Sequence, residues 1–261
     1  QIGDGVTSVV FLGTYAGRDV AVKQMKSDPN RMSEKAKVNF DRELTILQNV
    51  RHPNLVEFFG IVAEQNRVSF VMEFCRGGTA FDLLHNSGWT LSYPQKLKCA
   101  TDIASAMQYL HSVDPPVIHR DLKSLNSLLQ NEVRTQQDVP VVKVTDFGLS
   151  KVVDADDAQA CMTKAAGTCH WMAPEVFASN DYDRKADVYS FAMILYEIIC
   201  QDVPFGNIKA PRLGLMIVRG KRPDMEMVPP DCPPFLRDLM VACWAQSPVE
   251  RPDFDAIMVA L

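Results

Sequence analysis

The sequence predicts an α+β fold of two lobes, a small strand-rich lobe followed by a larger, mainly helical one. Residues 1–75 hold short β-branched and aromatic runs separated by Gly, Asn and Pro, which is typical of antiparallel strands. From Phe81 onward, apolar residues recur at helical spacing instead. We therefore divide the chain into lobes at 1–75 and 76–261, with a hinge at 75–78.

In the first lobe, one amphipathic helix is expected to interrupt four strands. The helix spans 33–48, because its apolar face repeats at i, i+3, i+4 and i+7, and Glu43 shares that face. The strands are expected at 9–12, 20–22, 55–62 and 68–74.

In the second lobe, loops and short strands over 117–172 separate the helices. The apolar run 188–200 carries Ser190 and Glu197, so it indicates a buried core helix rather than a membrane span. Helices are expected at 95–111, 187–199, 213–219, 234–243 and 253–261.

Composition excludes several classes of protein. With 261 residues, 47% apolar and 23% charged, the chain is of ordinary globular type. A net charge of −5 gives no reason to expect nucleic acid or an anionic membrane as a partner. The seven dispersed cysteines lack zinc spacing, so we expect reduced thiols and a cytoplasmic location. Because the chain opens on Gln1, we expect a domain excised from a longer protein.

The first motif is a glycine-rich segment at 3–10. It matches G-x-G-x-x-G-x-V except for Ser8 at the third glycine. Such glycines let backbone N–H groups approach phosphate oxygens, although a plain β-hairpin turn explains the pattern about as well. A dinucleotide-binding fingerprint is less favoured, because a strand follows rather than a helix.

The second motif places Lys23 on the apolar strand segment V-A-V-K. A lysine there is usually an exposed edge residue, but the hairpin upstream would let Lys23 reach into the cleft that it covers. Glu43 is a candidate partner, because a carboxylate on an inward helical face is unfavourable unless it pairs.

The third cluster is the most specific. H-R-D-L at 119–122 is followed by Asn126, by D-F-G at 146–148 and by A-P-E at 173–175. With V-A-V-K at 20–23 upstream in the right order, the chain resembles the eukaryotic protein kinases. Lys123 and the sequence G-T-C-H-W-M-A-P-E ending at Glu175 resemble the tyrosine-kinase-like group of serine/threonine kinases, which includes Raf-like and mixed-lineage kinases.

The resemblance implies a bilobal kinase fold with a five-stranded antiparallel sheet plus one helix. It also implies transfer of the γ-phosphoryl group of ATP to Ser or Thr hydroxyls of proteins, with Mg²⁺, in intracellular signalling. Asp121 would orient the hydroxyl and accept its proton, and Lys123 would offset charge on the moving phosphoryl group. Lys23, aimed by Glu43, would hold the α- and β-phosphates. The implied Mg²⁺ ligands are Asn126 and Asp146.

The resemblance also implies a nucleotide pocket between the lobes. Met72 would be the gatekeeper behind the adenine, and backbone groups of Glu73 and Cys75 would hydrogen-bond the adenine edge. The residues assigned to nucleotide binding are Ile2, Gly3, Asp4, Gly5, Val6, Thr7, Ser8, Val9, Val10, Ala21, Lys23, Met72, Glu73, Cys75 and Leu128.

Regulation would act on the segment between D-F-G and A-P-E. Arg120 would attract an anion, and Thr163 is the first candidate for phosphorylation, by an upstream kinase or in trans by a second copy. Ser150 is a weaker candidate. Thr168 would rather shape the substrate-docking surface, although it too is a candidate for modification.

Four further residues are expected to serve the structure rather than the chemistry. His119 would be buried and pack within the stack of side chains that couples the lobes, Asp187 would anchor the backbone near Asp121, and Arg251 would pair with Glu175.

The sequence departs from the kinase pattern at two places besides Ser8. Ser127 places a hydroxyl in an apolar stack, at a cost of about 1–3 kcal/mol unless it finds a partner. The polar stretch 130–138 is expected to form a surface hairpin loop.

Two rival classes of protein remain. A pseudokinase or scaffold of the same fold would bind partners without transferring phosphate. A small-molecule kinase is disfavoured by the A-P-E segment and the long helical lobe.

Overall fold

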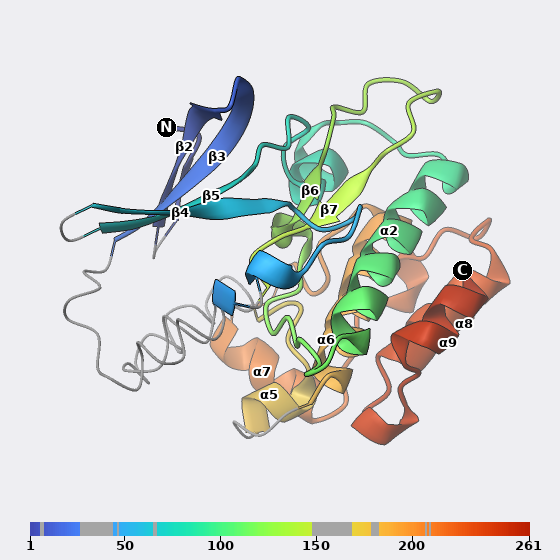
Figure 1. The fold of residues 1–261 in the computed structure, drawn as a ribbon. Coiled ribbons are helices and arrows are strands. Elements are labelled where there is room, and N and C mark those ends of the chain that lie inside the picture. Colours follow the sequence, from blue (N-terminus) through green and yellow to red (C-terminus); the bar gives the residue numbers. More distant parts are fainter. Residues whose placement is uncertain are drawn as a thin grey trace.

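The computed structural model describes residues 1–5, 8–26, 44–45, 47–64, 67–147, 169–178, 183–206, 208 and 210–261. An antiparallel sheet lies at one end of the molecule and most of the helices lie at the other (Figure 1). The strands run in the order β1-β2-β3-β5-β4. Their bounds are β1 Gly3–Asp4, β2 Ser8–Tyr15, β3 Arg18–Met25, β4 Phe58–Glu64 and β5 Arg67–Glu73. The predicted fold class, including the five-stranded sheet, is confirmed.

The strand expected at 55–62 begins later, at Phe58. Leu55 forms an isolated bridge with Val144, and the N–H of Val56 donates to the carbonyl of Val144 at 3.0 Å. These two residues therefore pair with the helical lobe before the chain enters the sheet. The prediction was wrong there because a β-branched run does not reveal which of two sheets it joins.

Part of the helix expected at 33–48 lies outside the described residues, Glu43 included. Residues 44–45 and 47–49 are helical, and Leu47 is buried in the core.

The larger lobe contains the predicted helices with shifted ends. The helix α2 starts at Tyr93 rather than at residue 95, because Gln95 Oε1 accepts from the N–H of Ser92 at 3.1 Å and caps the first turn. The main elements are α2 Tyr93–Ser112, β6 Ser127–Leu129, β7 Val142–Val144, α5 Pro174–Ala178, α6 Lys185–Cys200, α7 Ala210–Val218, α8 Pro234–Cys243 and α9 Phe254–Ala260. Short turns are η2 Asp82–Asn86, η3 Ser124–Asn126, η4 Met225–Met227 and η5 Pro248–Glu250.

The helix α6 forms the centre of this lobe. All its residues from Ala186 to Ile199 are buried except Ser190, and it packs against α2 and α8. A helix that is apolar all round belongs in a core, as the sequence predicted for this run. Among the described helices, none combines the length and the apolarity that crossing a membrane requires.

The hinge residues pair directly with the β6–β7 hairpin. The N–H groups of Arg76 and Gly77 donate to the carbonyls of Gln130 and Leu129 at 3.1 and 2.9 Å. A Cβ on Gly77 would lie 2.5 Å from Cβ of Leu129 and 2.3 Å from the carbonyl oxygen of Asn131, so only glycine fits. This close approach seats the sheet against the helical lobe.

Candidate active site

The helix α6 anchors the backbone of the loop at 119–126 through hydrogen bonds to Asp187. Both oxygens of Asp187 accept backbone N–H groups, Oδ2 from His119 and Oδ1 from Arg120, each at 2.9 Å. His111 Nε2 lies 2.9 Å from Oδ2 as well. Asp187 is 1% exposed, so its charge is held by these partners rather than by water. The predicted anchoring role of Asp187 is confirmed.

Two polar side chains of this loop, those of Lys123 and Asn126, donate to the carboxylate of Asp121. Lys123 Nζ lies 3.0 and 2.8 Å from the two oxygens of Asp121. Asn126 Nδ2 donates to the backbone carbonyl of Asp121 at 2.8 Å and to Oδ2 at 2.9 Å. The Asp121 side chain is 30% exposed, so it stays accessible to a substrate while its position is fixed by two donors.

The β6–β7 hairpin brings the second acidic motif to the same place. Ser127 pairs with Val144 in antiparallel register, so Asn126, just before β6, lies opposite Thr145, the residue that precedes Asp146. The N–H of Thr145 donates to the carbonyl of Asn126 at 2.9 Å. Residues twenty positions apart in the sequence thus face one site.

The small lobe contributes Lys23 to this site. Lys23 Nζ donates to Asp146 Oδ1 at 2.6 Å, and the two side chains are 13% and 29% exposed. Burial alone would raise the pKa of Asp146, but the Lys23 ammonium holds it below the ordinary value. Lys23 is therefore a largely buried side chain that contacts the second acidic motif, not an exposed residue of a sheet edge. Its other predicted partner, Glu43, lies outside the described residues.

His119 is fully buried, as predicted. Its Nε2 lies 3.0 Å from the carbonyl oxygen of Thr145, and its Nδ1 accepts the N–H of Asp121 at 3.3 Å. Leu47, Phe58 and Phe147 are buried in the same continuous apolar core, which runs through both lobes. The buried His119 therefore contacts the backbone of both motifs, at Asp121 in H-R-D-L and at Thr145 just before D-F-G.

In the glycine-rich segment, β1 pairs antiparallel with β2 and no described residue is helical, which supports the choice against a dinucleotide fingerprint. The N–H of Ile2 donates to Val10 at 2.8 Å, and the N–H of Gly5 donates to the carbonyl of Ser8 at 2.9 Å. Lys26 Nζ contacts Asp4 Oδ1 and the carbonyl of Gly5, both at 2.7 Å. Lys26 was not singled out from the sequence. Val6 and Thr7 lie outside the described residues.

Strand register brings several of the predicted adenine contacts onto neighbouring strands. Val10 pairs with Lys23, and Ala21 pairs with Met72. From the other lobe, Leu128 bridges to Thr79 beyond the hinge. The described members of this predicted set are Ile2, Gly3, Asp4, Gly5, Ser8, Val9, Val10, Ala21, Lys23, Met72, Glu73, Cys75 and Leu128.

The backbone around the hinge narrows the choice of adenine partners. The N–H of Glu73 donates to the carbonyl of Glu57 at 2.8 Å, so it is engaged within the protein. The Glu73 side chain forms an ion pair with Lys143, whose Nζ lies 3.0 Å from Oε2. Sequence reasoning missed this pair, whose only signal is a lysine inside the apolar run of β7. Burial raises the pKa of the Cys75 thiol to about 12, so the thiol stays protonated.

The donor set fits a hard divalent cation. Because Asn126 Nδ2 donates to Asp121, its Oδ1 is the atom that can ligate a cation, and Asp146 supplies a carboxylate beside it. Oxygen donors of this kind suit Mg²⁺, which binds through one or two protein ligands together with substrate phosphates. Consistent with such a sparse set, the described residues contain no cluster of three His, Cys, Asp or Glu side chains able to hold a metal.

Two structural expectations are also resolved. Arg251 makes a two-point ion pair with Glu175, at 2.6 and 2.8 Å, as predicted. The buried hydroxyl of Ser127 donates to the carbonyl of Lys123 at 3.2 Å, so it has a partner and the expected penalty is offset.

The regulatory expectations can be followed only in part. Arg120 is half-buried and adopts a positive φ of 66°. Within the part of the chain that the structure describes, its guanidinium has no recorded ion pair or hydrogen bond. Thr163, Thr168 and Ser150 lie outside the described residues.

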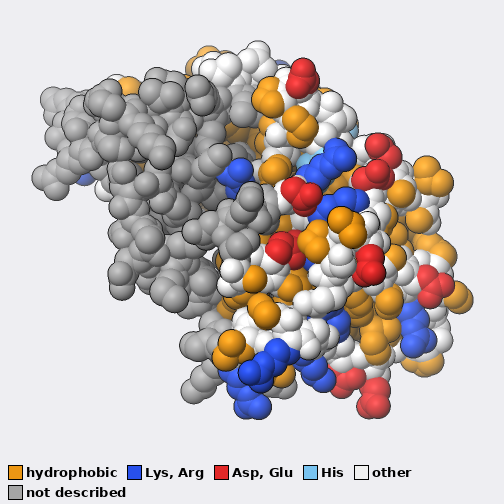
Figure 2. Space-filling view, turned by 90° about the horizontal axis from the view of Figure 1, so that it is seen from below, with side chains coloured by type: hydrophobic (Ala, Val, Ile, Leu, Met, Phe, Trp, Pro, Cys, Tyr) orange, Lys and Arg blue, Asp and Glu red, His pale blue; other side chains and the backbone are white. Residues whose placement is uncertain are grey.

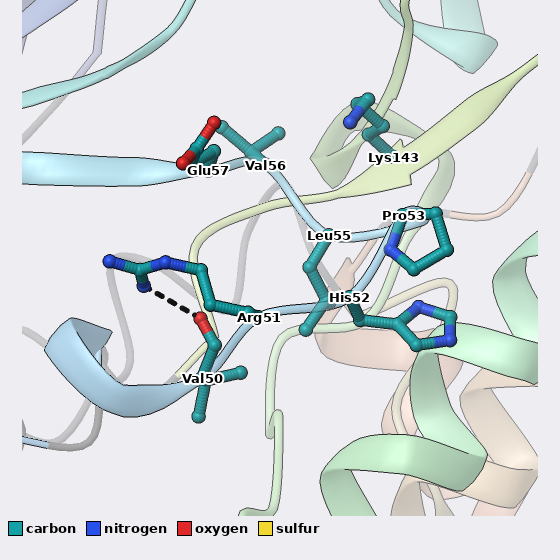
Figure 3. A pocket seen from close by; sticks show the side chains of 8 residues that line it. All are labelled: Val50, Arg51, His52, Pro53, Leu55, Val56, Glu57 and Lys143. Atoms are coloured by element: carbon teal, nitrogen blue, oxygen red, sulfur yellow. Dashed lines mark hydrogen bonds between the residues drawn. The ribbon is translucent and has the colours of Figure 1, made fainter.

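A separate pocket of about 350 Å³ lies between the segment that precedes β4 and Lys143 (Figure 3). It is formed by the segment that enters β4 and by Lys143 of β7. None of the predicted nucleotide contacts lines it, so it is distinct from the cleft. Its lining residues are Val50, Arg51, His52, Pro53, Leu55, Val56, Glu57 and Lys143.

The two-lobed fold, with a glycine-rich hairpin, a lysine and two acidic motifs facing one cleft, is that of an enzyme that transfers phosphoryl groups. A sequence profile of the family described as protein tyrosine and serine/threonine kinase matches residues 1–261. The chain belongs to this protein kinase family. Membership implies ATP as the phosphoryl donor and proteins as substrates.

Individual relatives are serine/threonine kinases. A probable LIM domain-containing serine/threonine-protein kinase of Dictyostelium discoideum is 38% identical over 98% of this chain and 37% of its own length. A second Dictyostelium protein, the probable serine/threonine-protein kinase drkC, is 37% identical over the whole chain and 34% of its own length. The serine/threonine-protein kinase STY17 of Arabidopsis thaliana is 34% identical over the whole chain and 43% of its own length. The chain thus spans well under half the length of these relatives.

Proposed function

We propose that this chain transfers the γ-phosphoryl group of ATP to serine and threonine hydroxyls of proteins. The observation that carries the proposal is the convergence of Lys23, Asp121, Asn126 and Asp146 on one cleft between the lobes. Relatives named as serine/threonine kinases support the choice of acceptor hydroxyl.

In this reaction, the Asp121 carboxylate orients the substrate hydroxyl and accepts its proton. It is 30% exposed and held by Lys123 and Asn126, so it is presented to the substrate in a fixed position. Positioning a general base in this way contributes about 10²–10⁴-fold to a rate. Lys123, the closest cation to Asp121, offsets charge on the phosphoryl group as it moves.

Lys23 binds the α- and β-phosphates. In the structure, Lys23 Nζ donates to Asp146 Oδ1 at 2.6 Å, so the Lys23 ammonium connects the small lobe with the second acidic motif. Asp146 and Asn126 are the residues that would hold Mg²⁺. When bound, that ion neutralises charge on the β- and γ-phosphate oxygens.

Nucleotide binding falls to the cleft walls. We assign the cover to Ile2, the glycine-rich segment 3–8 and Val10, and the other walls to Ala21, Met72 and Leu128. The backbone of Cys75 and the carbonyl side of Glu73 would meet the adenine edge, because the N–H of Glu73 already donates to Glu57. The proposed boundary between the two lobes follows Cys75, shortly after β5 ends at Glu73.

Regulation is proposed to act through Arg120, with Thr163 as the phosphorylated residue and Thr168 shaping substrate docking. The guanidinium of Arg120, a half-buried residue, would pair with a phosphate. Six described cysteines are free thiols, which fits a reducing intracellular compartment.

On the described part of the face in Figure 2, acidic and basic side chains are interspersed, which favours protein substrates over nucleic acid.

The test is incorporation of label from γ-labelled ATP into a generic protein substrate, followed by identification of the phosphorylated amino acid. We expect label on serine and threonine, and none with a Lys23→Met variant that folds normally. Label on tyrosine alone would contradict the choice of acceptor. No incorporation by the unmodified protein, with or without prior phosphorylation by an activating kinase, would favour the scaffold alternative.

A further inference from the structure

One buried carboxylate of α6 is not accounted for by the roles above. Glu197 is 0% exposed and lies in an otherwise apolar stretch of the helix. Its oxygens meet three side chains that belong to three different segments. Burying a carboxylate is costly unless donors compensate it, so three partners here call for an explanation.

The three partners of Glu197 are Ser124, Trp171 and His85. Ser124 Oγ donates to Glu197 Oε1 at 2.7 Å, and Trp171 Nε1 donates to Oε2 at 2.6 Å. His85 Nε2 lies 2.9 Å from Oε1. Ser124 belongs to the loop at 119–126, Trp171 lies just before α5, and His85 belongs to η2 beyond the hinge.

The position of Ser124 connects this network to the chemistry. Asp187 and Glu197 lie ten residues apart on α6, a separation of about 15 Å along a helix. Asp187 holds the backbone just before Asp121, and Glu197 holds Ser124 just after Lys123. The loop is therefore fixed to one rigid helix on both sides of its two reactive side chains.

Trp171 is held by the same helix at two points. Besides the bond from Nε1 to Glu197, its backbone carbonyl accepts from Ser190 Oγ at 2.8 Å. Trp171 is 3% exposed, so the segment leading to α5 cannot move without disturbing α6.

We propose that Glu197 is a positioning residue for phosphoryl transfer, which acts through Ser124 on Asp121 and Lys123 and through Trp171 on the segment before α5. The inference rests on the proposed function. Both oxygens are occupied by internal donors, so Glu197 does not bind substrate. A shift of about 1 Å in reacting groups can cost a hundredfold in rate, so even partial loosening should be measurable.

Ser124→Ala tests the link with the smallest change. It removes only the hydroxyl, whereas Glu197→Gln would alter all three contacts and could unfold the lobe. We expect kcat to fall roughly tenfold, with KM for ATP and for peptide within about twofold of the original. Rates are normalised to nucleotide-binding stoichiometry, so a lower folded fraction does not count as lower kcat. The matched control is Thr101→Val, which removes a hydroxyl bonded only within α2 and should leave kcat unchanged.

A second variant separates positioning from general stability. Trp171→Phe removes a second donor to Glu197. If Ser124 and Trp171 both act through Glu197, the double variant with Ser124→Ala should show coupled rather than additive losses in kcat. If the unmodified protein is active and the Ser124→Ala variant keeps kcat within twofold, the inference about Glu197 is wrong, while the proposed function still stands. A peptide KM raised more than tenfold at unchanged kcat also overturns it, because that is the signature of substrate binding. An inactive unmodified protein overturns the proposed function and the inference together.

Discussion

Two loops of the cleft are held in opposite ways. The loop at 119–126 rests on Asp187, which is 1% exposed and accepts two backbone N–H groups. The glycine-rich segment is held instead by Lys26 and Asp4, whose side chains are 44% and 59% exposed. Buried charge-assisted bonds are strong and geometrically strict, whereas exposed ion pairs contribute little and are screened by salt.

This difference matches what each loop has to do. Under the proposed function, the base that accepts a proton must keep its position to a fraction of an ångström, so its loop is anchored to a buried helix. Under the same proposal, the cover over the nucleotide opens and closes around each ATP, so weak contacts suit it. The predictions below break or sharpen this contrast, from the largest expected effect to the smallest.

The largest effect is expected from Asp146→Asn. The change removes the carboxylate that pairs with Lys23 and would hold Mg²⁺, so we expect about a thousandfold loss of phosphotransfer. Because the Asp146 side chain is 29% exposed, the free energy of unfolding should change by only about 1 kcal/mol. Activity and thermal unfolding are measured on the same preparation. Retention of most of the activity would show that the metal assignment is wrong.

Asp187→Ala should damage the rigid loop through the fold. One buried and one part-buried backbone N–H group lose their acceptor, which we expect to lower the free energy of unfolding by about 2–5 kcal/mol. Urea unfolding measures the change. Asp238→Ala, on the exposed face of α8, is the control and should lie within about 0.5 kcal/mol of the original protein. Equal stability of the two variants would refute the anchoring role.

The pH dependence of stability should reveal the Lys23–Asp146 pair. The pKa of Asp146 lies below its ordinary value of 3.8, so the pair stabilises the fold fully above that value and loses its effect as the pH falls through the folded-state pKa. The stability difference between the original protein and Asp146→Asn should therefore shrink as the pH is lowered from about 4 through the folded-state pKa. Urea titrations at each pH provide the values, and a difference that grows on acidification would have the wrong sign.

The smallest effect is expected from Lys26→Ala in the weakly held segment. Losing an exposed contact to Asp4 and Gly5 should change stability by less than about 1 kcal/mol. KM for ATP should change only a few-fold, and the change should fade at high salt. Kinetics at low and high salt provide the comparison. A loss as large as that of Asp187→Ala would mean that the two loops are not held differently after all.

Much of the candidate site could be predicted because its residues occur in short sequence motifs. Asp121, Lys123 and Asn126 lie within six residues, and the hairpin that brings Asp146 beside them follows from two short apolar runs. The anchoring role of Asp187 was also predictable, but only through the family resemblance.

The remainder depends on contacts that the sequence order hides. Glu197 was recognised only as a charge that argues against a membrane span, because its donors lie 26, 73 and 112 residues away. The partner of Ser127 is a backbone carbonyl, which no residue pattern encodes. The loop after β6 was predicted to be a surface hairpin, but Gln95 of α2 also ties it down by donating to the carbonyls of Thr135 and Asp138, both at 2.9 Å.

The central claim is that a rigidly placed Asp121 acts on the substrate hydroxyl. The most direct test is the single-turnover rate of phosphoryl transfer to a peptide serine by Asp121→Asn, with ATP binding measured in parallel. Asparagine keeps the size of the side chain but cannot accept the proton, so we predict a rate about 10²–10⁴-fold lower with ATP affinity unchanged. A rate within tenfold of the original protein would contradict the account.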